Sequence, residues 1–176
     1  LLGSINLAKL ISKPFEKCAS MDLMALRELT GTAVRMLDNV IDISRYPIDQ
    51  QREEAVSKRR IGLGITGLAD ALIMCGVRYG SEEAVNLTKN WLRVLRDSAY
   101  RCSIDLAKEK GSFPLFVKEK FIENHNVKKL PKDLRAGIKS YGIRNALLTS
   151  IAPTGTISLL ANNVSSGLEP VFAFKY

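Results

Sequence analysis

Cysteine and histidine are scarce in this 176-residue sequence, and their scarcity excludes several kinds of site. The three cysteines, Cys18, Cys75 and Cys102, are odd in number, widely spaced and without a CxxC pair. With His125 as the one histidine, a structural zinc site has too few ligands, and we expect three reduced, partly buried thiols of a cytosolic protein. His125 lies in a polar stretch, so we interpret it as a surface residue rather than the base of a Ser-His-Asp triad.

Long hydrophobic runs and targeting signals are lacking as well. The sequence has no run of about 18 apolar residues, the length that predicts a membrane helix. Its first residues contain neither a basic segment nor a small-residue cleavage site, so we expect no signal peptide. The composition, 46% hydrophobic and 25% charged, is typical of globular rather than disordered proteins. Because Leu1 is no initiator Met and Tyr176 follows an apolar run, we expect the chain to be the middle of a larger protein.

Hydrophobic periodicity predicts long helices. Apolar residues recur with a helical period over residues 23–41, after a candidate N-cap at Ser20. Tyr46 precedes a proline and is therefore expected to end this helix. The charged residues 49–60 are expected to form a short surface helix or a structured connection, and further helices are expected over residues 68–75 and 82–110.

The last third of the chain changes character. Residues 117–142 are basic and irregular, and we expect one or two short helices there. Residues 145–151 are predicted to form a buried strand that ends at Ala152, and residues 169–174 a final strand. Long helices between short apolar strands favour an α/β fold in which helices are in excess.

Residues 62–67, GLGITG, match the G-x-G-x-x-G pattern of dinucleotide sites, in which glycines let a pyrophosphate approach a helix N-terminus. That pattern should follow a buried strand, but residues 57–60 are polar. No acidic residue about 20 positions further on ends a second strand. We therefore favour a tightly packed strand or turn that enters a helix, with a nucleotide-binding oxidoreductase as an alternative.

The net charge of +8, from 26 Lys+Arg against 18 Asp+Glu, raises the question of whether the protein binds nucleic acid. Basic residues concentrate in residues 117–144, which could contact phosphates. However, Glu119, Glu123 and Asp133 interrupt this stretch, and no aromatic ladder accompanies it. A solvated face is favoured, and a helical nucleic-acid-binding module that uses this stretch is kept as the alternative.

Residues 151–158, IAPTGTIS, combine features that suit phosphate binding. An expected strand leads into a tight turn of small hydroxyl residues and then into an apolar, helix-like run. Backbone N–H groups at such a helix start, with the hydroxyls of Thr154, Thr156 and Ser158, could hold a phosphate without a P-loop lysine. An ordinary threonine-capped turn fits the same residues, which leave both interpretations open.

Four segments in register resemble the large, catalytic subunit of ribonucleotide reductase, and together they cover nearly the whole chain. They are LGSINLA (residues 2–8), LDNVID with RYP (37–42 and 45–47), RRIGLG through LADAL (59–72), and RN through APTGTIS to SGLEP (144–170). The PTGTIS form and the SGLEP that follows are most similar to the adenosylcobalamin-dependent class. The iron- or manganese-dependent class is the second choice.

The resemblance implies a helix-rich α/β piece of the family's ten-stranded barrel, from the second half-barrel. Residues 1–176 would then be a single fragment of the catalytic barrel domain, truncated at both ends. The family converts ribonucleotides to 2′-deoxyribonucleotides by thiyl-radical chemistry, with a finger-loop cysteine and two redox cysteines. One redox cysteine would lie immediately before Leu1, so we expect no catalytic residue in this fragment and no activity of the fragment alone.

The resemblance also assigns a substrate-phosphate loop and implies partners. The residues of that loop are Pro153, Thr154, Gly155, Thr156 and Ile157, with Ser158 adjacent. For the parent enzyme the resemblance implies adenosylcobalamin, or alternatively a di-metal radical small subunit. It also implies a ribonucleoside di- or triphosphate substrate and a thioredoxin-type reductant. The parent would be a cytoplasmic enzyme of deoxyribonucleotide biosynthesis for DNA replication, with homo-oligomers expected and neither membrane nor nucleic acid as a partner.

Overall fold

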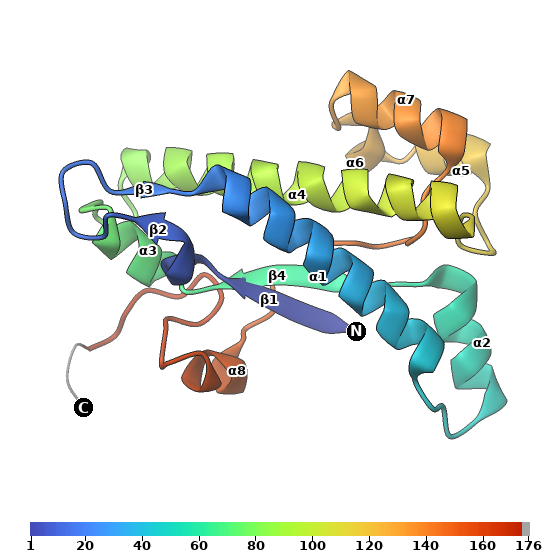
Figure 1. The fold of residues 1–176 in the computed structure, drawn as a ribbon, viewed down its shortest axis with the longest axis horizontal. Helices are drawn as coiled ribbons and strands as arrows, with labels where there is room; N and C mark the ends of the chain where they lie inside the picture. The colour runs from blue at the N-terminus through green and yellow to red at the C-terminus, as the bar shows by residue number, and fades with distance from the viewer. Residues whose placement is uncertain (174–176) are drawn as a thin grey trace. The chain divides into compact units, whose positions relative to one another are not determined.

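The computed structural model describes residues 1–173, which form two compact units. The first unit comprises residue 1 with residues 30–62 and 96–149, and the second comprises residues 2–29, 63–95 and those from 150 onward. Two long helices, α1 (Leu23–Ile43) and α4 (Glu82–Lys110), each contribute residues to both units (Figure 1). Far more residues lie in helices than in strands, which confirms the predicted helix-rich α/β character.

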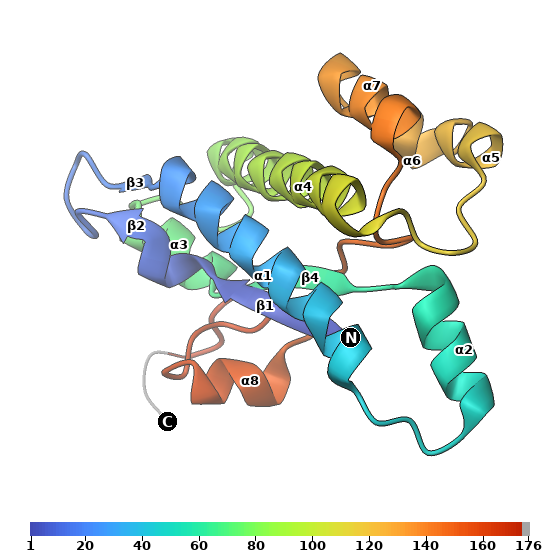
Figure 2. The same ribbon diagram turned by 45° about the vertical axis from the view of Figure 1, so that its right-hand side comes forward.

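The second unit is built around a buried strand. Strand β4 (Gly62–Thr66), buried at every residue, pairs with β1 (Leu2–Asn6), and the two run side by side in Figures 1 and 2. A 3-10 helix, η1 (Leu7–Leu10), packs on α3 (Leu68–Met74). Strands β2 (Ile11–Ser12) and β3 (Ser20–Met21) pair antiparallel, and the short helix α8 (Gly155–Leu160) follows later in the chain.

Helix α1 begins at Leu23, and its cap differs from the one expected. The Asp22 carboxylate accepts the N–H groups of Met24 and Ala25 at 3.0 and 2.9 Å, so Asp22 is the N-cap. The candidate Ser20 was wrong because it belongs to strand β3. The helix ends at Ile43, as Tyr46-Pro47 predicted. Its buried residues recur with a helical period and are Leu26, Thr30, Val34, Leu37, Asp38 and Ile41. The expected apolar face was only partly right, because Leu29 and Met36, which belong to the pattern, are exposed.

Helix α4 confirms the prediction made from its caps and apolar face. The Ser81 hydroxyl accepts the N–H of Ala84 at 3.1 Å, which satisfies one unpaired donor of the first turn. The helix stops at Lys110, and Gly111 adopts a φ of 81°, the left-handed region that glycine tolerates. Trp91 and Leu95 are each only 3% exposed, so the face predicted to pack is buried.

The first unit contains the charged and basic helices. Helix α2 (Asp49–Lys58) has no buried residue, in agreement with a surface helix. Residues 117–142 form three helices rather than the one or two expected: α5 (Lys118–Ile122), α6 (His125–Lys128) and α7 (Lys132–Tyr141) (Figure 1). Leu130, Leu134 and Ile138 give this stretch buried apolar residues of its own.

Two predicted strands are not formed. Residues 145–151 are extended and bonded beside β4, with Ser150 N–H donating to Leu63 O at 3.1 Å, but the pairing reaches only an isolated bridge at Thr149. Residues 169–173 form no strand either, because within residues 1–173 no strand lies beside them, and Phe172 is 81% exposed. Phe174 lies outside the described residues. Apolar character alone therefore misled the prediction, since a strand also needs a partner for its backbone groups.

Candidate phosphate-binding site

The predicted phosphate loop lies in the second unit and opens onto a cavity of about 460 Å³. Thr154 adopts a φ of 56° and turns the chain into the short helix α8. Within residues 1–173, the N–H groups of the first helical residues, Gly155, Thr156 and Ile157, have no backbone acceptor. A Cβ built on Gly155 would meet nothing within 4 Å, so this backbone is open to an approaching ligand.

Two segments of the chain form the walls of this cavity, and one carboxylate also lines it. Gly155, Thr156 and Ser158 belong to the first wall, residues 163–166 and 170–173 supply most of the second, and Asp70 of α3 completes the lining. No lysine or arginine is among the described residues that line it. An anion here would therefore be bound by backbone N–H groups and hydroxyls rather than by a cationic side chain.

The loop hydroxyls have different roles, which the sequence did not separate. The Thr156 side chain is exposed, whereas the Thr154 hydroxyl is buried and accepts the N–H of Gly167 at 2.7 Å. The Ser158 hydroxyl is buried as well and donates to Gly155 O at 2.8 Å. Of the hydroxyls expected to face a phosphate, Thr156 is the one that is open to it.

Not all of the predicted residues meet at the cavity. Gly155, Thr156 and Ser158 line it, whereas Pro153, Thr154 and Ile157 do not. Pro153 is exposed, and the Ile157 side chain is 47% exposed. The backbone of Ile157 still contributes an N–H to the first turn of α8.

The second wall is anchored on the turn between β4 and α3, which sequence reasoning missed. The carbonyl of Ser165 accepts the Thr66 hydroxyl at 2.8 Å and the Gly67 N–H at 2.7 Å. The Asp70 carboxylate accepts the N–H of Ser165 at 2.5 Å. A signal was present, because Gly67 has no side chain to cap the helix that it precedes, and an acidic residue stands at the third helical position.

The GLGITG pattern is a packing feature. Gly62 and Gly64 lie within strand β4, and only Gly67 lies in the turn that enters α3, so the three glycines do not form a dinucleotide-binding loop. A Cβ on Gly64 would collide with the carbonyl oxygen of Ser150, so glycine is required for the backbone leading to the phosphate loop to lie against β4. The packing interpretation is confirmed, and the nucleotide-binding oxidoreductase loses its basis.

A buried polar network in the first unit accounts for three of the motifs. The Arg59 guanidinium donates to the Asp38 carboxylate at 2.9 Å and to Asp42 at 2.7 Å, and the Arg59 side chain is 3% exposed. The Asn145 amide donates to the same Asp38 oxygen at 2.9 Å, and its own oxygen accepts the Ser103 hydroxyl at 2.9 Å. The hydrogen bond from Arg59 holds the pKa of Asp42 below its ordinary value. Every member is hydrogen-bonded, which is how a buried ion pair persists.

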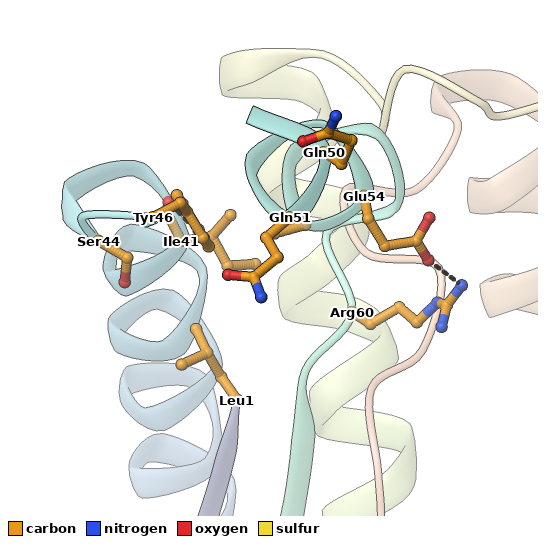
Figure 3. Close-up of a pocket in the computed structure, with 9 residues that line it drawn as sticks. Leu1, Ile41, Ser44, Tyr46, Gln50, Gln51, Glu54 and Arg60 are labelled. Carbon is orange, nitrogen blue, oxygen red and sulfur yellow. Dashed lines mark hydrogen bonds and ion pairs between the residues drawn. The ribbon is translucent and has the colours of Figure 1, made fainter. Parts of the chain in front are cut away.

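The first unit also has a cavity of about 490 Å³ beside helix α2, shown in Figure 3. Ile41 and Tyr46 supply part of its wall, and the Tyr46 hydroxyl is engaged with the carbonyl of Ile41 at 3.2 Å. Its charged lining residues, Glu54 and Arg60, pair with each other at 2.8 Å (Figure 3). This cavity thus offers no unpaired charge to a ligand.

Neither the three cysteines nor His125 are among the described residues that line the cavity at the candidate phosphate loop. Cys18 is exposed, whereas Cys75 and Cys102 are half-buried. Burial raises the pKa of the Cys75 and Cys102 thiols. His125 is exposed on α6, as predicted. In the described part of the chain, no group of three or more His, Cys, Asp or Glu side chains could hold a metal ion. None of the helices in residues 1–173 has the length and apolarity that crossing a bilayer requires.

The basic stretch forms surface ion pairs. Lys128 pairs with Glu123 at 2.5 Å, and Arg101 of α4 pairs with Asp133 at 2.6 Å. The Phe113, Phe116 and Phe121 rings pack against one another in edge-to-face or tilted geometry, with centroids 5.4 to 5.9 Å apart, instead of forming a ladder for bases. These contacts favour the solvated face over a nucleic-acid interface.

Comparison with known proteins identifies the family. A model of the ribonucleotide reductase barrel domain matches residues 1–176. The vitamin B12-dependent ribonucleoside-diphosphate reductase of Mycobacterium tuberculosis (strain CDC 1551 / Oshkosh) is 42% identical over 99% of this chain and 22% of its own length. The Thermoplasma acidophilum enzyme of the same name is 37% identical over 99% of this chain and 20% of its own.

A relative with a different name is also similar. The ribonucleoside-diphosphate reductase subunit alpha of Chlamydia muridarum is 33% identical over 97% of this chain and 18% of its own length. The chain thus spans about a fifth of the length of the curated relatives that it matches. The match over all 176 residues and the helix-rich α/β fold agree, and the chain belongs to the ribonucleotide reductase barrel-domain family.

Proposed function

We propose that residues 1–176 are a single piece of the catalytic barrel domain of a ribonucleoside-diphosphate reductase, and that this piece binds the substrate's phosphates. The first part is supported by the family match and by relatives that carry that name. The second part is supported by one local observation: the N–H groups of residues 155–157 have no backbone acceptor in the described residues, and Gly155 and Thr156 line an open cavity.

The chain's own groups would perform the binding. The N–H groups of Gly155, Thr156 and Ile157 would donate to phosphate oxygens, and the exposed Thr156 hydroxyl would add a further hydrogen bond. Thr154 and Ser158 would contribute indirectly, since their hydroxyls hold the turn in shape. Because helix α8 has only six residues, its dipole is small and the N–H groups carry most of the attraction.

The radical chemistry would be carried out by other parts of the full-length protein. The finger-loop cysteine and the redox cysteines are expected elsewhere, so residues 1–176 alone should be inactive. Similarity to the B12-dependent relatives favours adenosylcobalamin as the cofactor, with a di-metal small subunit as the alternative. We expect neither to be bound by this chain itself, and the described residues contain no group of three or more His, Cys, Asp or Glu that could hold a di-metal centre.

The parent's cellular role follows from the proposed activity. A thioredoxin-type protein would restore its redox thiols, and its products would be deoxyribonucleotides for DNA replication in the cytoplasm. Whether the substrate is a diphosphate or a triphosphate depends on contacts beyond this loop, and the names of the relatives favour the diphosphate.

The test is substrate affinity in the full-length reductase. Gly155→Val should weaken ribonucleoside diphosphate binding at least tenfold, because its side chain would project into the open space in front of the N–H groups. Thr156→Ala should cost about 1–2 kcal/mol, the usual contribution of one hydrogen bond to a charged group, and should raise KM while kcat is retained.

Gly31→Val is the matched control. A Cβ at Gly31 likewise meets nothing within 4 Å, but this glycine lies in helix α1, away from the loop in sequence. It should leave substrate affinity unchanged. If Gly155→Val binds the diphosphate as tightly as the wild type, this loop is not the phosphate site.

A further inference from the structure

We propose that Asp70 is a positioning residue for the phosphate site, acting through Ser165 to hold the second wall of the cavity in place. This inference rests on the proposed phosphate-binding function. Asp70 belongs to helix α3, and Ser165 stands 95 positions further along the chain. Both line the cavity that Gly155 and Thr156 open onto.

The contacts between the two residues are reciprocal. The Ser165 N–H donates to the Asp70 carboxylate at 2.5 Å, and the Ser165 hydroxyl accepts the N–H groups of Ala69 at 3.1 Å and Asp70 at 3.4 Å. This is the hydrogen-bond pattern of a capping box, in which a serine at the helix start and an acid at the third position satisfy each other's backbone. Here the serine comes from a distant segment, because the residue that precedes the helix, Gly67, has no side chain.

A second contact couples the two walls of the cavity. The Thr154 hydroxyl accepts the Gly167 N–H at 2.7 Å and lies 3.3 Å from the hydroxyl of Thr66. Thr66 in turn donates to the carbonyl of Ser165 at 2.8 Å. The β4–α3 turn therefore holds both the segment that carries the candidate N–H donors and the segment opposite.

This arrangement matters for binding because N–H groups act only if they are already aimed at the anion. Thr154 keeps its left-handed φ of 56°, which is unfavourable for threonine, while surrounding hydrogen bonds fix it. If Ser165 were released, residues 163–167 would lose the anchor that closes the cavity and supports Thr154. The Asp70 carboxylate is negative and already accepts an N–H, so its effect on a phosphate is exerted through position rather than contact.

The experiment uses the full-length reductase with CDP as the substrate probe. Asp70→Ala should raise KM about 5- to 30-fold, the equivalent of one charge-assisted hydrogen bond, with kcat within about twofold of the wild type. Asp70→Asn keeps an oxygen that accepts the Ser165 N–H, so its KM should stay within about threefold of the wild type. Glu83→Ala removes an exposed acid on α4 in the same unit and should change neither parameter.

Amide hydrogen exchange at Ser165 provides a readout that does not depend on substrate. Exchange should accelerate in Asp70→Ala and return toward the wild-type rate in Asp70→Asn. An unchanged exchange rate at Ser165 in Asp70→Ala would mean that the Asp70 carboxylate does not hold the Ser165 N–H. Faster exchange with an unchanged KM for Asp70→Ala, while Gly155→Val still raises KM, would overturn the positioning role and leave the phosphate loop standing.

Further outcomes separate the two proposals. If neither Gly155→Val nor Asp70→Ala alters KM, the phosphate-binding function itself fails, whatever the exchange rates. A fall in kcat that matches the loss of folded protein, at unchanged KM, would assign Asp70 a purely structural role and overturn the proposal. Should Asp70→Ala fail to fold, Ser165→Ala removes only the capping hydroxyl, and an unchanged KM in that variant would also overturn the proposal.

Discussion

At the scale of single residues, charged and hydroxyl side chains stabilise this chain where they are buried and contribute little where they are exposed. Arg59 and Arg35 illustrate the difference, since each donates to carboxylates, but the Arg59 side chain is 3% exposed and that of Arg35 is 44% exposed. A buried charge that loses its partner has no water to replace it, whereas an exposed charge does.

The pair Arg59–Asp38 should therefore be sensitive to removal of one partner. Arg59→Met would leave the Asp38 carboxylate, 0% exposed, without its main counter-charge and should lower the free energy of unfolding by about 3–5 kcal/mol. Arg35→Met, which removes the exposed pair with Glu109, should cost about 1 kcal/mol or less. Urea unfolding of both variants measures the difference, and equal losses would contradict the burial of the network.

The lowered pKa of Asp42 leads to a prediction of how the free energy of unfolding depends on pH. The hydrogen bond from Arg59 lowers the pKa of this carboxyl in the folded state, so its contribution is fully present above the unfolded pKa, about 3.9. The contribution is lost as pH falls through the lower, folded pKa. In Asp42→Asn the free energy of unfolding should fall less steeply below about pH 4 than in the wild type. Parallel curves for the two proteins would show that Asp42 is not coupled to folding.

At the scale of elements, the long helices are specified locally and the strands are not. Helices α1 and α4 carry a periodic apolar face and capping residues at their first turns, all within a few positions of each other. Strand β4 takes its partners from β1 and from residue 150, both distant in the sequence. Strand β4, which lies beside the chain leading to the candidate phosphate loop, thus depends more on tertiary contacts than the long helices do.

Helix α4 offers a test of the packing face. Trp91→Ala should cost about 3–5 kcal/mol, because the indole is 3% exposed and its removal would leave a cavity beside Leu95. On the same helix, Val85 is 44% exposed, so Val85→Ala should change stability by about 0.5 kcal/mol or less. Thermal unfolding compares the two, and a melting temperature unaffected by Trp91→Ala would place this face in solvent.

At the scale of the whole molecule, the chain matches the ribonucleotide reductase barrel domain over all its residues and spans about a fifth of the length of its relatives. Strand β1 pairs with β4 and has no strand on its other side within residues 1–173. Large apolar side chains such as Leu160 and Phe172 are more than 80% exposed, at 88% and 81%. Unpaired strand edges and exposed apolar residues favour association with other chains.

The isolated 176-residue chain should therefore self-associate. Light scattering should detect oligomers at micromolar concentration, and Leu2→Lys, which places a charge at a residue 66% exposed on β1, should reduce them. A monodisperse monomer for the wild-type chain would contradict an open strand edge. Ile43→Lys, at an exposed residue of helix α1 that belongs to no strand, is the control.

Much of the fold could be predicted from the sequence, but less of the site. The helices over residues 23–43 and 82–110 followed from their periodicity, and the Ser81 cap of the second from its residue type. The turn into the short helix Gly155–Leu160 followed from its small hydroxyl residues and from family resemblance. The strands expected at residues 145–151 and 169–174 did not follow, because an apolar run does not reveal whether a partner strand lies beside it. The roles of Thr154 and Ser158 were equally hidden, since a hydroxyl's direction depends on its neighbours in space.

The sequence by itself determined the helices, the scarcity of metal ligands and the family, because each depends on residue types at short spacing. Only the tertiary structure decided which hydroxyl remains open at the phosphate loop and that Ser165 caps helix α3 from 95 positions away. The physical reason is the range of the interactions: helix periodicity and capping act within about four residues. The partners of a buried hydrogen bond, in contrast, are set by how distant segments pack, and no local pattern encodes them.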